Sequence, residues 1–344
     1  MTSPEQIAVL DQQFLGEIDQ ARIVLSRRDS PVLPTMIIRD EELSRELSAD
    51  IYFASDLGQP SGSFKIRGAE NFVYNLTFEQ RKRGIVTASA GNHAAGIALS
   101  SRLAIDRTMI PMNVHIFMPE NTPQNKIDNV ETLGRGDSIK VVKVGENFDV
   151  CQMAAKAYCY DEGSIYASPF NDRKVIAGQA TWGLEISKAI NPDQVISPVG
   201  GGGLIAGITV AIKSRNSEAE IIGVEPEGAA SLQLALRNGK PSPLEGEIDT
   251  TIDGAAVREI GAIPFELSSH LLGRVITVSN EEVNRATTRL RERQTWQLEA
   301  ELAGGLSLAG LEKLRESLVG KTVVYLVSGR NLSRERYENE VRRA

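Results

Sequence analysis

Apolar and polar residues follow one another along the chain in blocks that predict strands and helices in turn. Short runs of β-branched and other apolar residues are typical of buried strands, and apolar positions three or four apart are typical of helices. The predicted strands are 51–54, 85–89, 114–118, 140–144, 164–167, 195–199, 221–224, 275–278 and 322–327. The predicted helices lie within 1–30 and at 41–47, 68–76, 91–103, 122–133, 148–160, 177–189, 204–214, 280–293 and 303–319. This alternation predicts an α/β protein with mostly parallel sheets covered by helices on both faces.

Length and composition indicate a globular chain of two domains or one large one. The 344 residues are 41% hydrophobic and 24% charged, which is ordinary for that class. The net charge of −7 and the lack of a long basic run argue against nucleic-acid binding. No apolar stretch is long enough for a transmembrane helix, and residues 1–20 lack the apolar core of a secretory signal. We therefore expect a cytoplasmic protein.

Cysteine and histidine are too few and too scattered to indicate a metal site. Cys151 and Cys159 lie on one predicted helix without metal-ligand spacing, so reduced thiols are expected. His93, His115 and His270 are far apart in the sequence. We expect neither a disulfide nor a metal.

Residues 61–69, Ser-Gly-Ser-Phe-Lys-Ile-Arg-Gly-Ala, place Lys65 among small and apolar residues directly after a turn. Apolar surroundings disfavour the charged ammonium, so a lysine buried there has a lowered pKa and can act as a nucleophile and base. A surface lysine beside a turn is the plainer interpretation. The chemical one is that Lys65 forms a Schiff base with a carbonyl cofactor.

Consecutive glycines at Gly200–Gly203 join a predicted strand to a helix that begins at Leu204. Glycine amides at a helix N-terminus can surround a phosphate, although the Gly-Lys-Ser/Thr of nucleotide P-loops is missing. A tight structural turn is the alternative. Gly201, Gly203 and Ala206 also fit the dinucleotide pattern, so a dinucleotide-binding or non-catalytic protein stays open.

A further segment lies at the end of a predicted strand, where α/β proteins bind ligands. The segment Ser89, Ala90, Gly91, Asn92 and His93 suits a carboxylate at a helix start, and the Asn92 amide suits a phenolic oxygen. An ordinary capped helix start is the alternative, with His93 as a structural residue.

Ser328 ends the last predicted strand, where its hydroxyl could pair with a ring nitrogen or cap a turn. Glu301 is expected to be an exposed acid. A lysine, an anion cradle, a carboxylate loop and a neutral partner for a ring nitrogen are together what pyridoxal phosphate needs.

These motifs resemble the fold-type-II pyridoxal-phosphate enzymes, in the branch of threonine dehydratase (threonine ammonia-lyase) and serine racemase. The resemblance spans roughly residues 30–335, through 63–69, 88–93, 169–172, 176–181, 198–204, 223–226, 253–257 and 327–329. It implies a tryptophan synthase β-like fold with a large cofactor domain, 1–80 and 161–344, and a small mobile domain, 81–160. It also implies a homodimer or homotetramer.

The resemblance also implies a role for each site residue. Lys65 would carry pyridoxal 5'-phosphate as a Schiff base and remove the substrate's α-proton. The other residues that would contact the cofactor are Phe64 beside the ring, Asn92 at the phenolic oxygen, Gly200, Gly201, Gly202, Gly203 and Leu204 at the phosphate, and Ser328 at the pyridine nitrogen. The residues Ser89, Ala90, Gly91, Asn92 and His93 would receive the substrate carboxylate. The implied reaction turns L-threonine into 2-oxobutanoate and ammonia, with L-serine to pyruvate as a side activity.

Three segments depart from the family pattern. Phe53, Ala54 and Ser55 replace charged residues before the lysine turn, and Leu302 replaces a proline. Arg330 stands where glycine is usual, so we expect a cation near the cofactor ring that could pair with an acidic substrate. Serine racemase, 3-hydroxyaspartate dehydratase and another β-eliminating lyase therefore remain alternatives.

The metal and regulatory features of some family members are not expected here. The divalent metal site of serine racemase uses a glutamate, a backbone carbonyl and an aspartate, and the corresponding residues are Glu225, Ala229 and Ser231. The serine argues against a tightly bound metal. The sequence ends at 344 without a regulatory domain, so feedback control by isoleucine is not expected on this polypeptide.

Overall fold

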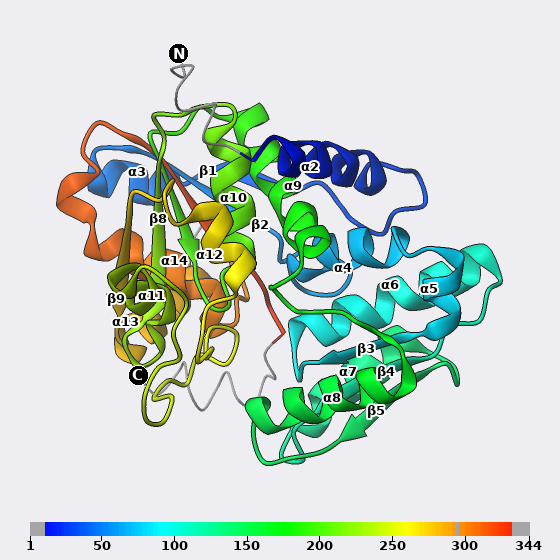
Figure 1. Cartoon of the computed structure of the whole chain (residues 1–344). Coiled ribbons are helices and arrows are strands. Elements are labelled where there is room, and N and C mark those ends of the chain that lie inside the picture. The colour runs from blue at the N-terminus through cyan, green and yellow to red at the C-terminus, as the bar shows by residue number, and fades with distance from the viewer. Residues whose placement is uncertain (1–10, 294–295, 332–344) are drawn as a thin grey trace.

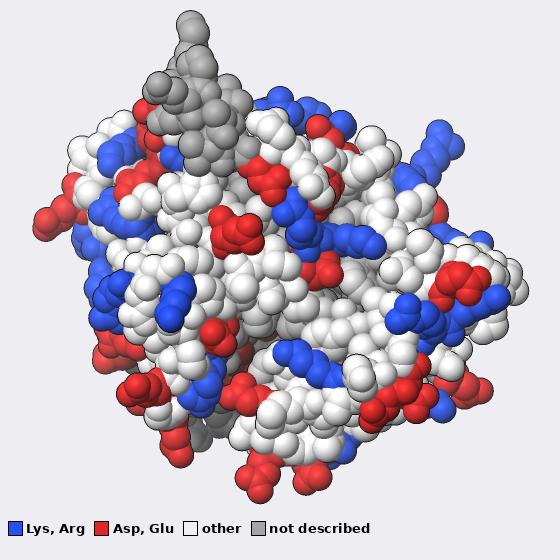
Figure 2. All heavy atoms as spheres, in the orientation of Figure 1, with Lys and Arg blue, Asp and Glu red and all other residues white. Residues whose placement is uncertain are grey.

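The computed structural model describes residues 11–293 and 296–331 (Figure 1). The parts of the predicted segments that fall at 1–10, 294–295 and 332–344 lie outside the described residues. Within the described ranges, no helix is long and apolar enough to cross a membrane. Acidic and basic side chains are interspersed on the face seen in Figure 2, without a large basic area on that face.

The larger of two sheets has six strands in the order β1-β2-β10-β7-β8-β9. Its strands are β1 Met36–Arg39, β2 Asp50–Ser55, β7 Gln194–Pro198, β8 Glu220–Pro226, β9 Arg274–Val278 and β10 Thr322–Val327. β1 pairs antiparallel with β2, and all the other neighbours are parallel. The α/β class with mostly parallel sheets is thereby confirmed.

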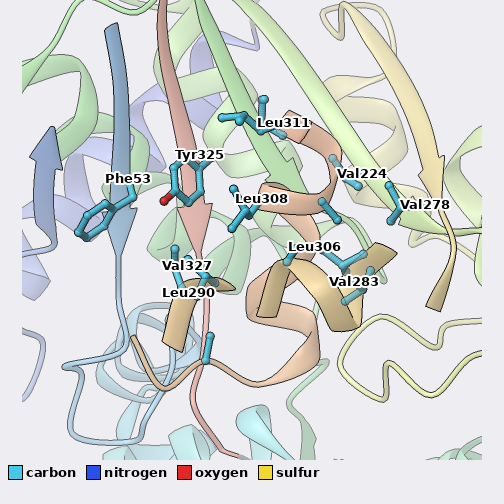
Figure 3. Packing of buried hydrophobic residues seen from close by; sticks show 14 of the residues in the cluster. Phe53, Val224, Val278, Val283, Leu290, Leu306, Leu308, Leu311, Tyr325 and Val327 are labelled. Atoms are coloured by element: carbon cyan, nitrogen blue, oxygen red, sulfur yellow. The ribbon is translucent and has the colours of Figure 1, made fainter. Parts of the chain in front are cut away.

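Helices cover both faces of this sheet, as its apolar strands predict. On one face lie α13 (Asn280–Glu292) and α14 (Leu302–Lys313), and Figure 3 shows Leu306 and Leu308 of α14 packed close to Tyr325 and Val224 of the strands. On the other face lie α9 (Arg173–Ala189) and α10 (Gly203–Lys213), whose apolar side chains include the fully buried Trp182. The larger sheet is thus packed against a hydrophobic core on each face.

The smaller sheet has four parallel strands in the order β5-β4-β3-β6 and lies apart from the larger one (Figure 1). Its elements are β3 Ile85–Ala88, α6 Asn92–Thr108, β4 Val114–Met118, α7 Gln124–Gly134, β5 Ile139–Lys143, α8 Phe148–Glu162 and β6 Ile165–Tyr166. β6 lies beyond the 81–160 range predicted for the small domain. The division into domains stays a prediction.

The remaining elements are α2 Gln12–Leu25, α3 Glu41–Leu47, α4 Lys65–Tyr74, α5 Phe78–Arg83, α11 Ser231–Asn238, α12 Ala262–Ser268 and short 3-10 turns at Glu227–Ala229 and Arg315–Ser317. The sequence did not predict β1, α5, α11 or α12. α4 begins three residues earlier than predicted, so its first residue is Lys65. α9 also begins early, because Asp172 caps it by accepting a hydrogen bond from the amide of Val175.

Candidate active site

A cavity of about 710 Å³ is lined by residues from the loops of both sheets. Its wall contains the residues that follow β3, β7 and β10, namely Ser89, Gly200 and Ser328, and the first residues of α4, α6 and α10. Carboxyl ends of parallel strands and N-terminal ends of helices are the usual ligand-binding edge of an α/β protein. Most of the motifs picked from the sequence therefore meet in one place.

Lys65 is the first residue of α4, and its half-buried side chain enters the cavity. Nζ donates a 2.7 Å hydrogen bond to the carbonyl oxygen of Pro169. Burial lowers the pKa of this amine to about 8, and the negative charge of Glu301 acts in the opposite direction. Neighbouring Phe64 is buried, with its ring 6.0 Å from that of Trp182. Lys65 is thus a candidate nucleophile and base.

Arg67, in the first turn of α4, is bound by two carboxylates. Its guanidinium donates to both carboxylate oxygens of Asp56, at 2.6 and 3.0 Å, and to Glu185 at 2.7 Å. The side chains of Arg67 and Asp56 are 0% exposed. A planar guanidinium bound to two carboxylates leaves the helix start little freedom, so Lys65, two residues earlier, projects in a fixed direction.

The uncharged segment before Asp56 has a packing role. Phe53 lies in the core with its ring 6.2 Å from that of Tyr325, and Ala54 is buried on the opposite face of the sheet. The Ser55 hydroxyl accepts a hydrogen bond from the amide of Leu57 at 3.3 Å. None of these three residues of the unusual segment lines the cavity.

The glycine segment forms a cradle at the start of α10. Gly202 has a φ of +87°, a left-handed conformation that side chains rarely adopt. A Cβ on Gly201 would lie 2.2 Å from the ring of Phe170, so only glycine fits there. The first amides of a helix have no acceptor within the helix, and Gly203 and Leu204, the first two residues of α10, line the cavity. The cradle has the chemistry of a phosphate site.

The segment from Ser89 to His93 forms a second helix start on the cavity wall. The Ser89 hydroxyl accepts hydrogen bonds from the amides of Gly91 and Ala94, both at 3.3 Å. His93 is buried, and its Nε2 lies 3.2 Å from the carbonyl oxygen of Ala167. Burial lowers the pKa of His93 to about 3, so the ring is neutral at physiological pH. Its side chain has the structural role that the plainer interpretation gave it.

Glu301 and Asn331 enter the site although the sequence did not single out their roles. Glu301 was expected to be exposed, but it is half-buried and lines the cavity. Asn92 Nδ2 donates to Glu301 Oε1 at 2.5 Å, and Asn331 Nδ2 donates to Asn92 Oδ1 at 2.6 Å. The only sequence signal for both was their place in family-like segments.

Ser328 and Arg330 differ in their relation to the cavity. Ser328 is buried in its wall, with the hydroxyl 3.3 Å from the carbonyl oxygen of Ala303. Arg330 is exposed and is not among the lining residues, and its backbone amide donates to the carbonyl oxygen of Gly62 at 2.9 Å. The structure therefore does not bring the Arg330 cation to the site.

Glu225, which aligns with a metal ligand of serine racemase, binds backbone amides in this structure. Its carboxylate accepts hydrogen bonds from the amides of Leu232 and Gln233, at 2.7 and 2.9 Å, at the start of α11. Burial raises the pKa of Glu225 to about 7. Within the part of the chain that the structure describes, no group of three or more His, Cys, Asp or Glu residues could hold a metal ion.

Comparisons with known proteins show which proteins this chain is similar to. Residues 29–329 match the family model described as pyridoxal-phosphate dependent enzyme. The L-threonine ammonia-lyase of Thermotoga maritima is 39% identical over 300 residues, which are 87% of this chain and 71% of that protein. The processed form of threonine deaminase isoform 2 from Solanum lycopersicum has a TM-score of 0.86 and 34% identity, over 99% of this chain and 94% of that one. Maize serine racemase has a TM-score of 0.84 and 26% identity, over 95% and 96% of the two chains.

Proposed function

Because the chain belongs to the family of pyridoxal-phosphate dependent enzymes, we propose that it is an ammonia-lyase that converts L-threonine into 2-oxobutanoate and ammonia. L-serine would give pyruvate as a side activity. The observation that carries the proposal is one cavity that holds a lysine amine of lowered pKa and a glycine cradle at a helix start. The identity to a threonine ammonia-lyase over most of the chain favours this member of the family's reactions.

The residues of the cavity fit the cofactor. The Lys65 amine would bind its aldehyde carbon, and the amides of Gly200–Gly203 and Leu204 would bind its phosphate. Asn92 would contact the phenolic oxygen, Ser328 the pyridine nitrogen, and Phe64 would lie beside the ring. Support for the phosphate position comes from Gly201, where the Phe170 ring leaves no room for a Cβ. Support for Ser328 comes from a buried hydroxyl that can donate its proton to an unprotonated ring nitrogen.

When bound, pyridoxal phosphate withdraws electrons from the bonds at the substrate's α-carbon. The chain's own groups do the rest. The segment Ser89–His93 would bind the substrate carboxylate through backbone amides at the start of α6, with His93 neutral behind it. The Lys65 amine, released when the substrate's amino group takes its place, would take the α-proton. The β-hydroxyl would leave as water, and the α-proton balances the proton that it gains. Water then replaces the amino group, so threonine yields 2-oxobutanoate and ammonia with no net change in water.

The charges around the cavity favour a substrate with a neutral side chain. Besides Lys65, the lining residues include one lysine, Lys126, and three acids, Glu146, Asp253 and Glu301. Lys126 Nζ is already 2.9 Å from Asp253 Oδ2. A β-carboxylate would therefore meet more negative than positive charge. Because Arg330 is exposed, the 3-hydroxyaspartate alternative loses the residue that suggested it.

A panel of β-hydroxy amino acids tests the proposal. Holoenzyme is incubated with L-threonine, L-serine or 3-hydroxyaspartate, and ammonia, keto acid and the enantiomers of the amino acid are measured. Equal amounts of ammonia and 2-oxobutanoate from threonine are expected, with Lys65→Ala as the inactive control. Conversion of L-serine into D-serine without keto acid would identify a racemase, the alternative that the likeness to maize serine racemase favours. Release of ammonia from hydroxyaspartate alone would overturn the charge argument.

We extend the proposal to motion of residues 81–160 as a small domain. Two ion pairs link this part of the chain to the segment 253–258. Lys126 pairs with Asp253 and Asp149 pairs with Arg258, each at 2.9 Å. Ion pairs between partly exposed side chains can break and re-form at low cost. A KM for threonine that rises with salt, and more so in wild type than in Arg258→Gln, would support closure through these pairs.

The proposal also includes a cytoplasmic homodimer or homotetramer. It rests on the resemblance to the family. Light scattering of the purified protein and fractionation of its host cells are the tests, and a monomer or a membrane-bound protein would contradict it.

A further inference from the structure

The side-chain amide of Asn92 makes hydrogen bonds through both its nitrogen and its oxygen. Its Nδ2 donates to Glu301 Oε1 at 2.5 Å, and its Oδ1 accepts from Asn331 Nδ2 at 2.6 Å. Asn92 is the first residue of α6, Glu301 immediately precedes α14, and Asn331 follows β10. One amide thus joins three elements that are far apart in the sequence.

The two partners determine which way the Asn92 amide points. A carboxylate accepts hydrogen bonds, so Glu301 requires Nδ2 on its side. Asn331 Nδ2 also donates to the backbone carbonyl of Ser61 at 2.8 Å, and a carbonyl can only accept. Asn331 therefore presents its NH2 group to both neighbours, and Asn92 must present its oxygen to Asn331. The second N–H of Asn92 remains for a further acceptor.

The backbone at Gly329 and Gly62 lies close to the side chains of Glu301, Asn92 and Asn331. A Cβ on Gly329 would lie 2.4 Å from Glu301 Oε1 and 3.2 Å from Asn92 Nδ2. A Cβ on Gly62, which has a φ of +77°, would lie 2.2 Å from Asn331 Oδ1. Close contact on these sides keeps the three side chains in the positions that their hydrogen bonds require.

We propose that Glu301 and Asn331 are positioning residues that hold the second N–H of Asn92 toward the cofactor's phenolic oxygen. The inference rests on the proposed function, because that function assigns the phenolic oxygen to Asn92. A donor held in place stabilises the oxygen in its ionised form and adds a hydrogen bond to a charged group. Both effects act on the cofactor before any amino acid binds.

Asn331→Asp is the test variant, because it keeps the size of the side chain and replaces its donor with an acceptor. The new carboxylate would repel Asn92 Oδ1 and the Ser61 carbonyl. Asn75→Asp is the matched control. Asn75 Nδ2 likewise donates to a backbone carbonyl and an asparagine oxygen, both of Asn71, at 2.8 and 3.0 Å, but lies outside the cavity wall. Glu301→Gln is the conservative variant, because its Oε1 can still accept from Asn92.

The readouts are the visible spectrum of the holoenzyme between pH 6 and 9 and the Kd for pyridoxal phosphate, both without amino acid. In Asn331→Asp we expect a Kd raised about tenfold or more, the size of one hydrogen bond to a charged group, and a changed pH dependence of the spectrum. Asn75→Asp is expected to match wild type, and Glu301→Gln to lie closer to wild type than Asn331→Asp.

A wild-type spectrum and Kd in Asn331→Asp would overturn the proposal. Asn331→Ala, which removes the donor without adding charge, takes its place if the aspartate variant does not fold. Asn331→Ala is judged by the same two readouts and the same criterion. Failure of the proposed function is distinguishable, because wild type would then bind no cofactor or would leave threonine unchanged.

Discussion

The Lys65 amine lies 2.7 Å from the carbonyl oxygen of Pro169, and both residues line the cavity. The two residues are 104 positions apart in the sequence. α4 supplies the amine and the segment after β6 supplies the acceptor, so the direction of the side chain is set by the fold. Burial lowers the pKa of the amine to about 8, which brings a substantial neutral fraction close to physiological pH.

The rate at which apoprotein takes up pyridoxal phosphate should therefore rise with pH and level off above about pH 8. The neutral amine is the nucleophile, and the pKa of Lys65 is about 8. Glu301 raises this pKa, so Glu301→Gln should move the midpoint to lower pH. Stopped-flow absorbance at several pH values measures both effects. A midpoint near 10.5, the ordinary value for lysine, would show that the amine is not buried as described.

Gly201→Ala should weaken cofactor binding and destabilise the fold by about 1–3 kcal/mol, because the new methyl group would overlap the Phe170 ring. Gly16→Ala is the control within α2, where nothing lies within 4 Å of a Cβ. That variant should instead stabilise by about 0.5–1 kcal/mol through helix propensity. Urea denaturation measures the free energy of unfolding, and cofactor titration measures the Kd for pyridoxal phosphate. Equal stability of the two variants would contradict the cradle geometry.

Arg67→Gln should cost about 3–5 kcal/mol of unfolding free energy, because it leaves the buried carboxylate of Asp56 without its cation. The comparison is Arg285→Gln, which breaks an exposed pair with Glu281 on one helix. There the expected loss is below about 0.5 kcal/mol. Urea midpoints at constant m-value measure the difference. Similar losses in the two variants would mean that Asp56 is reached by water.

Glu225 should make the protein less stable as the pH rises from about 4.5 to about 7. Its pKa is raised by burial from 4.5 to about 7, so the folded state binds a proton that the unfolded state releases. Its contribution is fully present below pH 4.5 and is lost as the pH rises through 7. Glu225→Gln cannot titrate, so its unfolding free energy should fall less than that of wild type between pH 4.5 and 7. Identical slopes would show that the carboxylate titrates normally in the fold.

Local patterns were enough to predict the main elements of the fold. The strand 114–118 and the helix 41–47 have the predicted bounds, because the apolar run lies within the strand and the caps Asp40 and Ser48 directly flank the helix. The short helices α5, α11 and α12 were missed, and the N-cap residues of α11 and α12 make no side-chain cap that could have signalled them. For α5 the signal is a capping box between Thr77 and Gln80.

The site was predictable where a motif is continuous and not where it joins distant segments. Lys65 and the glycine cradle are readable from a few adjacent residues. The contacts of Asn92 with Glu301 and Asn331 span 209 and 239 positions, so no local pattern reports them. The prediction that Arg330 brings a cation to the cofactor ring was wrong, because a local motif does not report the direction of a side chain. Its sequence neighbours line the cavity, but its own side chain is exposed.

The proposed attachment of the cofactor to Lys65 can be located by mass spectrometry after borohydride reduction. Reduction turns an imine between pyridoxal phosphate and a lysine into a stable amine, which digestion then assigns to one peptide. The cavity wall includes two lysines, Lys65 and Lys126. The modification is expected on the peptide that contains Lys65, and it should be lost in Lys65→Ala. A modification on Lys126, or on no peptide, would contradict this attachment.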